Sequence, residues 1–312
     1  MMEWTDRHDR FFLRLITQKT WLFTEMITAK AILKGDRQYL LGFDQSEHPI
    51  AIQLGGNNPE ELAESASIAE DYGYDEINLN VGCPSNKVQV GEFGASLMAS
   101  PELVADCIKK MQKVTSLPVS IKHRIGIDQY DSYDYVKAFV SQLADQGCCY
   151  FYVHARNAIL KGLNPKQNRE IPPLKYDYVY RLKSDFPHLT IVLNGGIIST
   201  EAAQQQLQYV DGVMIGRAAY HNPFMLVDVD RQLFDDLTPV TTRQVVLERL
   251  LPYVEQQLSQ GVKLHHITRH ILGLFHGVPG ARAWRQYLTT HAVKCDAGPE
   301  VILQAAHLVA TG

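Results

Sequence analysis

Seven short apolar runs recur up to residue 215 of this chain, and each ends in a glycine or a polar residue. They cover residues 21–24 (the weakest), 50–54, 77–81, 118–122, 150–154, 190–194 and 212–215. Segments with helical spacing of apolar residues lie between several of them, at 59–72, 101–114, 132–146 and 200–208. Strands that alternate with helices indicate βαβ units and a parallel sheet.

The polar residues at the strand ends predict a (β/α)8 TIM-type barrel, an α/β fold whose catalytic groups sit on the rim at the carboxyl ends of the strands. Six side chains fall there: Gln53, Asn80, Lys122, His154, Asn194 and Arg217. One polar residue after a strand can simply mark the start of a loop, whereas six in succession favour a site. Seven strands do not close such a barrel, so either one strand escapes recognition or the first strand precedes Met1. A doubly wound open sheet is the alternative fold.

The strand pattern stops after about residue 237. Amphipathic helical segments follow at 241–259, 263–274, 279–292 and 298–310. A barrel of about 250 residues leaves room for only a small appendage in this chain. We therefore expect a barrel over residues 1–237 and a C-terminal helical bundle over residues 238–312.

Composition narrows the class of protein. The five cysteines are odd in number and form no C-x-x-C pair, which favours reduced thiols in the cytoplasm. No apolar run approaches the roughly 18 residues that span a membrane, and the N-terminus lacks a signal-peptide core. The histidine clusters lack carboxylates or paired cysteines, so we expect no metal site.

The net charge of −4 argues against nucleic-acid binding through overall charge, but that charge is unevenly distributed. Residues 261–294 contain five Lys or Arg and five His but no Asp or Glu. The segment 156–175, which includes Lys166 and Arg169, carries five basic residues and a single Glu. A charge run is usually a solvated face, but an acid-free stretch of this length indicates a surface that binds a polyanion.

Cys83 differs from the other cysteines because it begins a rim loop, in the motif Asn78-Leu79-Asn80-Val81-Gly82-Cys83-Pro84-Ser85. A free thiol has a pKa of about 8.5 and is mostly protonated at neutral pH, so it can act as a general acid. The other four cysteines are interpreted as small buried hydrophobes.

Two further groups point to a phosphorylated, electron-rich cofactor. The turns Asn194-Gly195-Gly196 and Gly216-Arg217 follow the last two strands, where barrels commonly bind phosphate. Lys122 and His154 are cationic or can become so, and such groups stabilise the negative charge of a reduced flavin.

With these motifs the chain resembles the tRNA-dihydrouridine synthases, specifically their A-type subfamily. The resemblance covers essentially the whole chain. It also rests on Gln53-Leu54-Gly55-Gly56, Gly94-Ala95-Ser96-Leu97-Met98, Lys122-His123-Arg124-Ile125-Gly126, Val153-His154-Ala155-Arg156, Asn168-Arg169-Glu170-Ile171-Pro172-Pro173 and Gly280-Ala281-Arg282-Ala283-Trp284-Arg285.

The resemblance implies an FMN-binding (β/α)8 barrel with a C-terminal helical domain. It also implies NADPH-dependent reduction of the C5–C6 bond of uridines in the tRNA D-loop, at positions 20 and 20a. Reduced FMN would give a hydride to C6, and Cys83 would give a proton to C5. The target base must leave its stack to reach the flavin. No protein partner or membrane is implied, and we expect a monomer.

The remaining roles also follow from the resemblance alone. The residues expected to hold FMN are Met1, Gln53, Lys122, His154, Asn194, Gly195, Gly196, Gly216 and Arg217. Those expected to hold the uracil or the tRNA are Asn80, Lys166, Arg169, Arg282 and Arg285.

Two departures from the family pattern stand out. The family's first strand ends in Ala-Pro-Met, of which Met1 would be the only remnant here. Ser96 replaces a second cysteine that many relatives carry, which is compatible with Cys83 as the acid. Two other functions remain open: a flavin barrel that reduces a free pyrimidine, and a catalytically impaired barrel that binds RNA.

Overall fold

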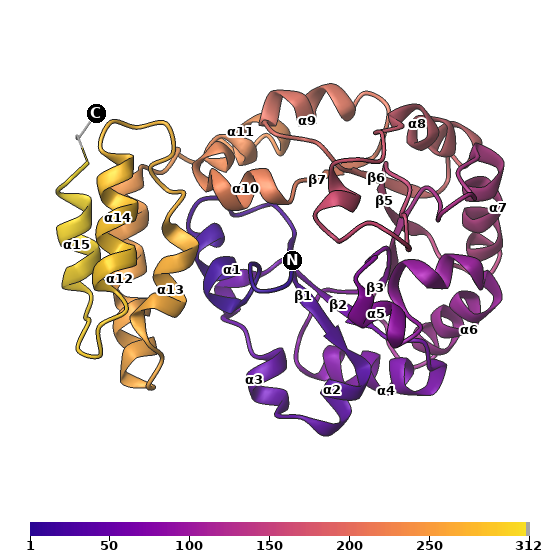
Figure 1. Cartoon of the computed structure of the whole chain (residues 1–312), viewed down its shortest axis with the longest axis horizontal. Helices are drawn as coiled ribbons and strands as arrows, with labels where there is room; N and C mark the ends of the chain where they lie inside the picture. The colour runs from indigo at the N-terminus through magenta and orange to yellow at the C-terminus, as the bar shows by residue number, and fades with distance from the viewer. Residues whose placement is uncertain (310–312) are drawn as a thin grey trace.

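The computed structural model describes residues 1–309, apart from the side chain of Lys87. Within that range seven strands form one parallel sheet in the sequential order β1 to β7, and the sheet curls around a common axis (Figure 1). The strands are β1 (Leu22–Thr28), β2 (Ile50–Gly55), β3 (Glu76–Val81), β4 (Val119–Arg124), β5 (Tyr150–His154), β6 (Thr190–Asn194) and β7 (Gly212–Met214). A doubly wound sheet reverses its strand order part-way, so this order confirms the TIM-type alternative.

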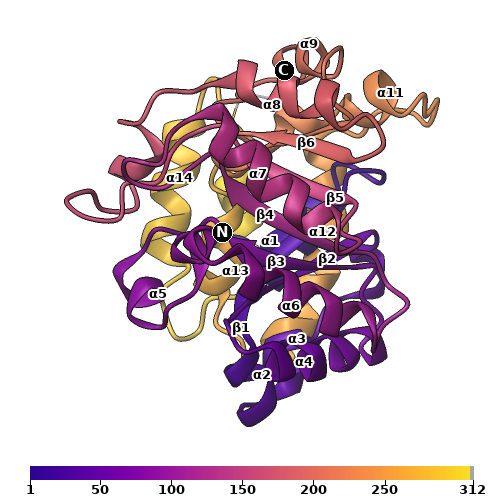
Figure 2. The same cartoon turned by 90° about the vertical axis from the view of Figure 1, so that its right-hand side faces the viewer.

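Helices follow most strands and cover the outer face of the sheet (Figures 1 and 2). Up to residue 233 they are α1 (Arg7–Arg14), α2 (Ala29–Lys34), α3 (Arg37–Leu41), α4 (Pro59–Asp71), α5 (Asn86–Val90), α6 (Pro101–Gln112), α7 (Tyr133–Ala144), α8 (Tyr176–Asp185), α9 (Thr200–Gln206), α10 (Arg217–His221) and α11 (Val229–Leu233). Asn58 caps α4 by accepting hydrogen bonds from two backbone N–H groups of its first turn. The four helices expected in this region are confirmed as α4, α6, α7 and α9.

The four helices expected at the C-terminal end are also confirmed. They are α12 (Arg243–Ser259), α13 (Leu264–Ile271), α14 (Ala281–His291) and α15 (Glu300–Ala306). They lie together beside α1 and α10, on the side of the sheet where its two edge strands β1 and β7 are not paired with each other (Figure 1). Trp284 is fully buried and packs against Phe275 with ring centroids 4.9 Å apart, which anchors α14 in this group. Residue 310, the last of the expected segment 298–310, lies outside the described residues. None of the described helices combines the length and the apolar character needed to cross a membrane.

The strand expected at 21–24 is shifted and longer. It begins at Leu22 and continues to Thr28 through a break in register between Phe23 and Met26. At that bulge the Thr24 hydroxyl accepts the backbone N–H of Gln53 at 2.9 Å, which keeps β1 joined to β2. Polar residues at the bulge interrupt the apolar pattern, and this is why the sequence indicates an earlier end.

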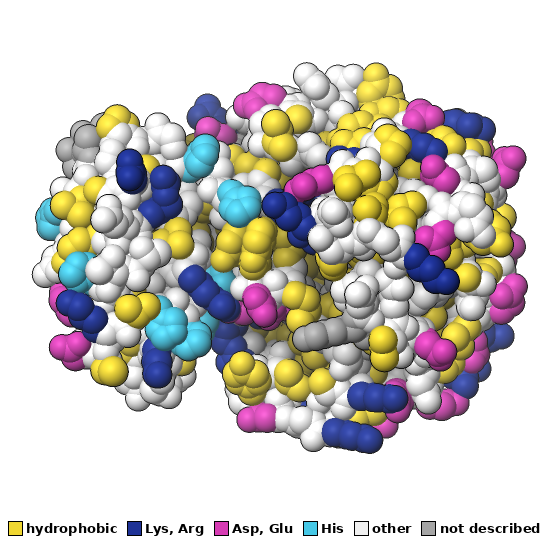
Figure 3. Space-filling view, viewed as in Figure 1, with side chains coloured by type: hydrophobic (Ala, Val, Ile, Leu, Met, Phe, Trp, Pro, Cys, Tyr) yellow, Lys and Arg dark blue, Asp and Glu magenta, His cyan; other side chains and the backbone are white. Residues whose placement is uncertain are grey.

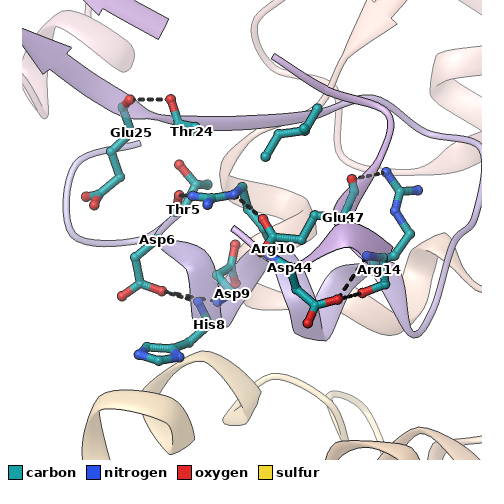
Figure 4. Close-up of polar contacts among 12 residues, drawn as sticks. Thr5, Asp6, His8, Asp9, Arg10, Arg14, Thr24, Glu25, Asp44 and Glu47 are labelled. Atoms are coloured by element: carbon teal, nitrogen blue, oxygen red, sulfur yellow. Dashed lines mark hydrogen bonds and ion pairs between the residues drawn. The ribbon is translucent and has the colours of Figure 1, made fainter. Parts of the chain in front are cut away.

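Helix α1 joins the sheet region to the C-terminal helices. The Asp6 carboxylate caps α1 and also accepts hydrogen bonds from Arg269 at 2.6 Å and His270 at 3.0 Å, both on α13. On its other side, Arg10 forms a buried ion pair with Glu47 at 2.6 Å (Figure 4). Burial of α1 between these two regions therefore fixes the C-terminal helices against the sheet.

Candidate functional site: the carboxyl rim of the sheet

The strand register brings the expected rim residues together. Asn80 pairs with Lys122 across β3 and β4, and His154 pairs with Asn194 across β5 and β6. Paired residues in a sheet share a height, so their side chains lie at one end of the strands. Gln53 lies on β2 beside them.

Cys83 begins the loop after β3 and is half-buried, with a free thiol. Of the other cysteines, Cys107 and Cys148 are buried as expected, but the expectation is wrong for Cys149 and Cys295, which are exposed. The Asn80 side-chain oxygen accepts the backbone N–H groups of Gly82 at 3.1 Å and Cys83 at 2.9 Å. The Cys83 carbonyl accepts the N–H of Ala95 at 2.9 Å. Hydrogen bonds on both sides of the residue therefore fix the backbone that carries the thiol.

Side-chain amides continue from this loop into the sheet. The Asn80 amide nitrogen donates to Gln53 Oε1 at 2.8 Å, and Gln53 Nε2 donates to Asn78 Oδ1 at 2.8 Å. The three amides are therefore oriented by one another, and this side of the rim carries neutral donors and acceptors beside a thiol.

Lys122 provides a cation on the neighbouring strand. Its ammonium group donates to Asn194 Oδ1 at 3.0 Å, and Asn194 Nδ2 donates to the Met214 carbonyl at 2.8 Å. Burial, reinforced by the nearby charge of Arg124, lowers the pKa of Lys122 to about 8. The amine is therefore mostly protonated at neutral pH but close to its titration range.

The surroundings of His154, which is expected to be a potential cation, disfavour its charged form. Burial, together with the charges of Arg124 and Lys122, lowers its pKa well below the usual value. Its ring lies against the turn at Gly195, where an added Cβ would come within 2.7 Å of the imidazole. The imidazole therefore packs closely against the glycine turn.

The turn after β6 contains two glycines, of which Gly195 is buried and Gly196 is exposed. Gly195 and Gly196 both have positive φ angles, of 115° and 73°, which other residues rarely adopt. The Tyr176 hydroxyl holds the turn by donating to the Gly195 carbonyl at 2.6 Å. The Met1 sulfur lies beside Gly216, so the N-terminus reaches the same rim.

The loop after β5 brings its own charges to this rim. Arg217 lies 3.3 Å from Glu170 and donates to the carbonyl of Arg169 at 3.4 Å. Arg169 is half-buried and Lys166 is exposed. The guanidinium groups on this loop and on α10 therefore border the site on the side of the glycine turns.

Arg282 and Arg285 lie apart from this cluster. Both are exposed on α14, among the C-terminal helices. Lys, Arg and His side chains gather over that part of the molecule in Figure 3. The expected site residues thus fall into two places, the rim and α14.

Arg124 holds the loops of the rim together, a role that was not predicted from the sequence. Its buried guanidinium donates to three backbone carbonyls, of Gly82 at 3.0 Å, Asn157 at 3.0 Å and Asn168 at 2.9 Å. One side chain therefore joins the Cys83 loop to two segments of the loop that carries Arg169. The sequence does indicate that Arg124 faces the site, because it follows Lys122 by two residues in β4 and therefore lies on the same face of the strand.

Comparison with known proteins decides the family. The family model described as "Dihydrouridine synthase (Dus)" matches residues 1–309. The chain belongs to the dihydrouridine synthase family.

Individual members of the dihydrouridine synthase family are similar over nearly their full length. A protein of Shewanella oneidensis is 55% identical over 311 residues, which cover 100% of this chain and 92% of that protein. Proteins of Synechocystis sp. (56% identical, 98% and 91% covered) and Vibrio cholerae (54% identical, 98% and 93% covered) are similar to the same extent. All three are named tRNA-dihydrouridine(20/20a) synthase.

Proposed function

We propose that this chain reduces uridines 20 and 20a of tRNA to dihydrouridine, using FMN and NADPH. The observation that carries the proposal is the half-buried Cys83 thiol held at the rim beside Lys122, in a chain 54–56% identical to proteins named for this activity.

The residues of the rim fit FMN. The turn itself requires glycine, because a Cβ on Gly195 would lie 2.7 Å from the His154 ring and a Cβ on Gly196 would come within 2.6 Å of Leu174. The exposed backbone of Gly196 is available to a ligand that approaches closely. Lys122 offers positive charge toward an electron-rich ring, and Arg217 offers it toward a phosphate. Gln53, Asn194, Gly216 and Met1 complete the proposed FMN site.

When bound, reduced FMN supplies a hydride to C6 of the uracil, and NADPH restores the reduced form. Cys83 donates the proton to C5, so hydride and proton together saturate the C5–C6 bond. The thiolate left behind lies close enough to Lys122 and Arg124 to interact with their charges. Solvent then returns the proton to Cys83. Asn80 and Arg169 orient the uracil over the cofactor.

The tRNA is proposed to bind across both places where site residues lie. Lys166 and Arg169 border the rim, while Arg282 and Arg285 are exposed on α14 and meet the phosphate backbone. We take residues 1–237 as the FMN-binding barrel and 238–312 as the helical tRNA-binding domain. A tRNA substrate also places the protein in the cytoplasm, where it would act as a monomer.

The test uses a bacterial strain whose tRNAs lack dihydrouridine at positions 20 and 20a. Expression of this chain should restore dihydrouridine at those two positions, mapped by chemical cleavage and sequencing. An unchanged tRNA, from cells in which the protein is soluble and carries FMN, would overturn the proposal.

Two other results would identify the alternatives. Tight tRNA binding by the purified protein without any dihydrouridine would indicate an RNA-binding barrel that has lost catalysis. Reduction of free uracil or a related free base, with tRNA unchanged, would indicate an enzyme of free pyrimidines.

A further inference from the structure

A buried carboxylate lies at the opposite end of β3 from Cys83. Glu76 is the first residue of the strand and is 4% exposed. Its two oxygens accept hydrogen bonds from the hydroxyls of Ser120, at 2.5 Å, and Tyr152, at 3.0 Å. Burial raises the pKa of Glu76, and these two hydrogen bonds act in the opposite direction. The reaction proposed above does not use this group.

Polar side chains connect Glu76 to the catalytic end of the strand. Glu76, Asn78 and Asn80 alternate along β3 and therefore point to the same face of the sheet. Asn78 Nδ2 donates to Ser120 Oγ at 2.8 Å, and Asn78 Oδ1 accepts from Gln53, which in turn accepts from Asn80. With the Asn80 bond to the Cys83 N–H, the hydrogen bonds run unbroken along the strand, over about 13 Å from Glu76 to Asn80.

The chemistry of the two ends fixes the direction of every bond between them. A carboxylate can only accept, so the Ser120 hydroxyl donates to Glu76 and has its lone pairs left for Asn78 Nδ2. That orientation turns the Asn78 oxygen toward Gln53, and the same logic turns the Asn80 oxygen toward the Cys83 loop. The backbone N–H groups of Gly82 and Cys83 require this orientation, because they can only donate.

We propose that Glu76 is a positioning residue, which acts through Ser120, Asn78, Gln53 and Asn80 to hold the Cys83 loop in its reactive orientation. A carboxamide can otherwise rotate by half a turn and exchange donor for acceptor. With the far end held by an acceptor-only group, such a rotation leaves two donors or two acceptors facing each other, which is unfavourable for buried groups. The proposal rests on the assigned role of Cys83 as proton donor, but the orientation of the loop can be measured independently.

The test removes, one at a time, the two hydroxyl groups that donate to Glu76. The quantity measured is the rate of amide hydrogen exchange of the Gly82 and Cys83 N–H groups. Ser120→Ala breaks the path between Glu76 and Asn78, and we expect about tenfold faster exchange, the loss of roughly one hydrogen bond. Tyr152→Phe also removes one donor from Glu76 but leaves the path intact, and we expect exchange as in the wild type. Glu76→Gln replaces the acceptor-only end with a carboxamide that can also donate, so we expect faster exchange than in the wild type, though by less than in Ser120→Ala.

Asn78→Ala breaks the path at a different link and should reproduce the faster exchange, so it carries the test if Ser120→Ala fails to fold. Unchanged exchange in the path-breaking variant, or equal acceleration in Tyr152→Phe, would overturn the proposal. The rate of dihydrouridine formation gives a second readout: kcat should fall in Ser120→Ala while KM for tRNA stays the same. A wild-type protein that forms no dihydrouridine would refute the proposed function, while the exchange rates would still decide the role of Glu76.

Discussion

The two sides of the rim are built from different chemical groups. On the β2–β3 side, neutral amides from Gln53 and Asn80 orient one another and hold the backbone of Cys83. On the β4–β7 side, the ammonium group of Lys122 and the glycine turn at Gly195 present positive charge and bare backbone. Under the proposed function the first side donates the proton, and the second side supplies most of the contacts to the cofactor, with Gln53 added from the first. The predictions below test whether the two sides can be disturbed separately.

The largest effect expected on the cofactor side comes from Gly195→Ala. Its φ of 115° strains any other residue by about 1–2 kcal/mol, and the new Cβ would lie 2.7 Å from the His154 ring. We expect at least a tenfold loss of FMN affinity, measured by flavin fluorescence, with tRNA binding unchanged. Gly73→Ala is the control, because φ there is 91° and nothing lies within 4 Å of its Cβ. Equal FMN loss in both variants would mean that strain alone, and not contact with the rim, matters.

A smaller effect, about tenfold in FMN affinity, is expected for Lys122→Met. Lys122 is charged below its pKa of about 8 and becomes neutral above it, so the wild-type affinity for the FMN anion should fall as the pH rises through 8. The variant should lose this pH dependence. The exposed Lys109→Met variant should keep it. A pH profile that is the same in Lys122→Met and the wild type would assign the titration to another group.

The smallest effect is expected from the combined change of Arg282 and Arg285 to Ala, which lies on neither side of the rim. Loss of two phosphate contacts should weaken tRNA binding several-fold and lower the slope of log affinity against log salt by about 2. FMN affinity should not change. The matched control is Lys109→Ala with Lys113→Ala, because both lysines are exposed at the C-terminal end of α6. If the control variant weakens tRNA binding equally, the effect arises from the overall charge of the protein, and α14 does not contact the tRNA.

Much of the fold follows from local patterns in the sequence. The strands β2 to β7 and the helices α4, α6 and α7 show clear apolar periodicity, and the rim follows because parallel strands end together. Helix α1 was missed because its charged residues look like a solvated segment. In the structure Arg10 is buried against Glu47, which lies 37 residues further along the chain. No local pattern carries that information.

The candidate site also contains some features that local sequence predicts and others that depend on tertiary packing. Residues at strand ends, such as Lys122 and Asn194, could be predicted, because their position depends only on the strand. For Arg124 the sequence places the side chain on the same face of β4 as Lys122, but its three carbonyl partners could not be predicted, because they come from loops whose paths are set by tertiary packing. The neutral state of His154 likewise depends on burial and on cations from neighbouring strands.

The central claim, that Cys83 donates the proton and is not needed to hold the cofactor, is tested most directly with Cys83→Ala. FMN content and dihydrouridine formation at positions 20 and 20a are measured on the same preparation, with the exposed Cys149→Ala as control. We predict unchanged FMN content and tRNA binding, with turnover lower by about 10³-fold, the range of general acid catalysis. Turnover at the wild-type rate in Cys83→Ala would contradict the account.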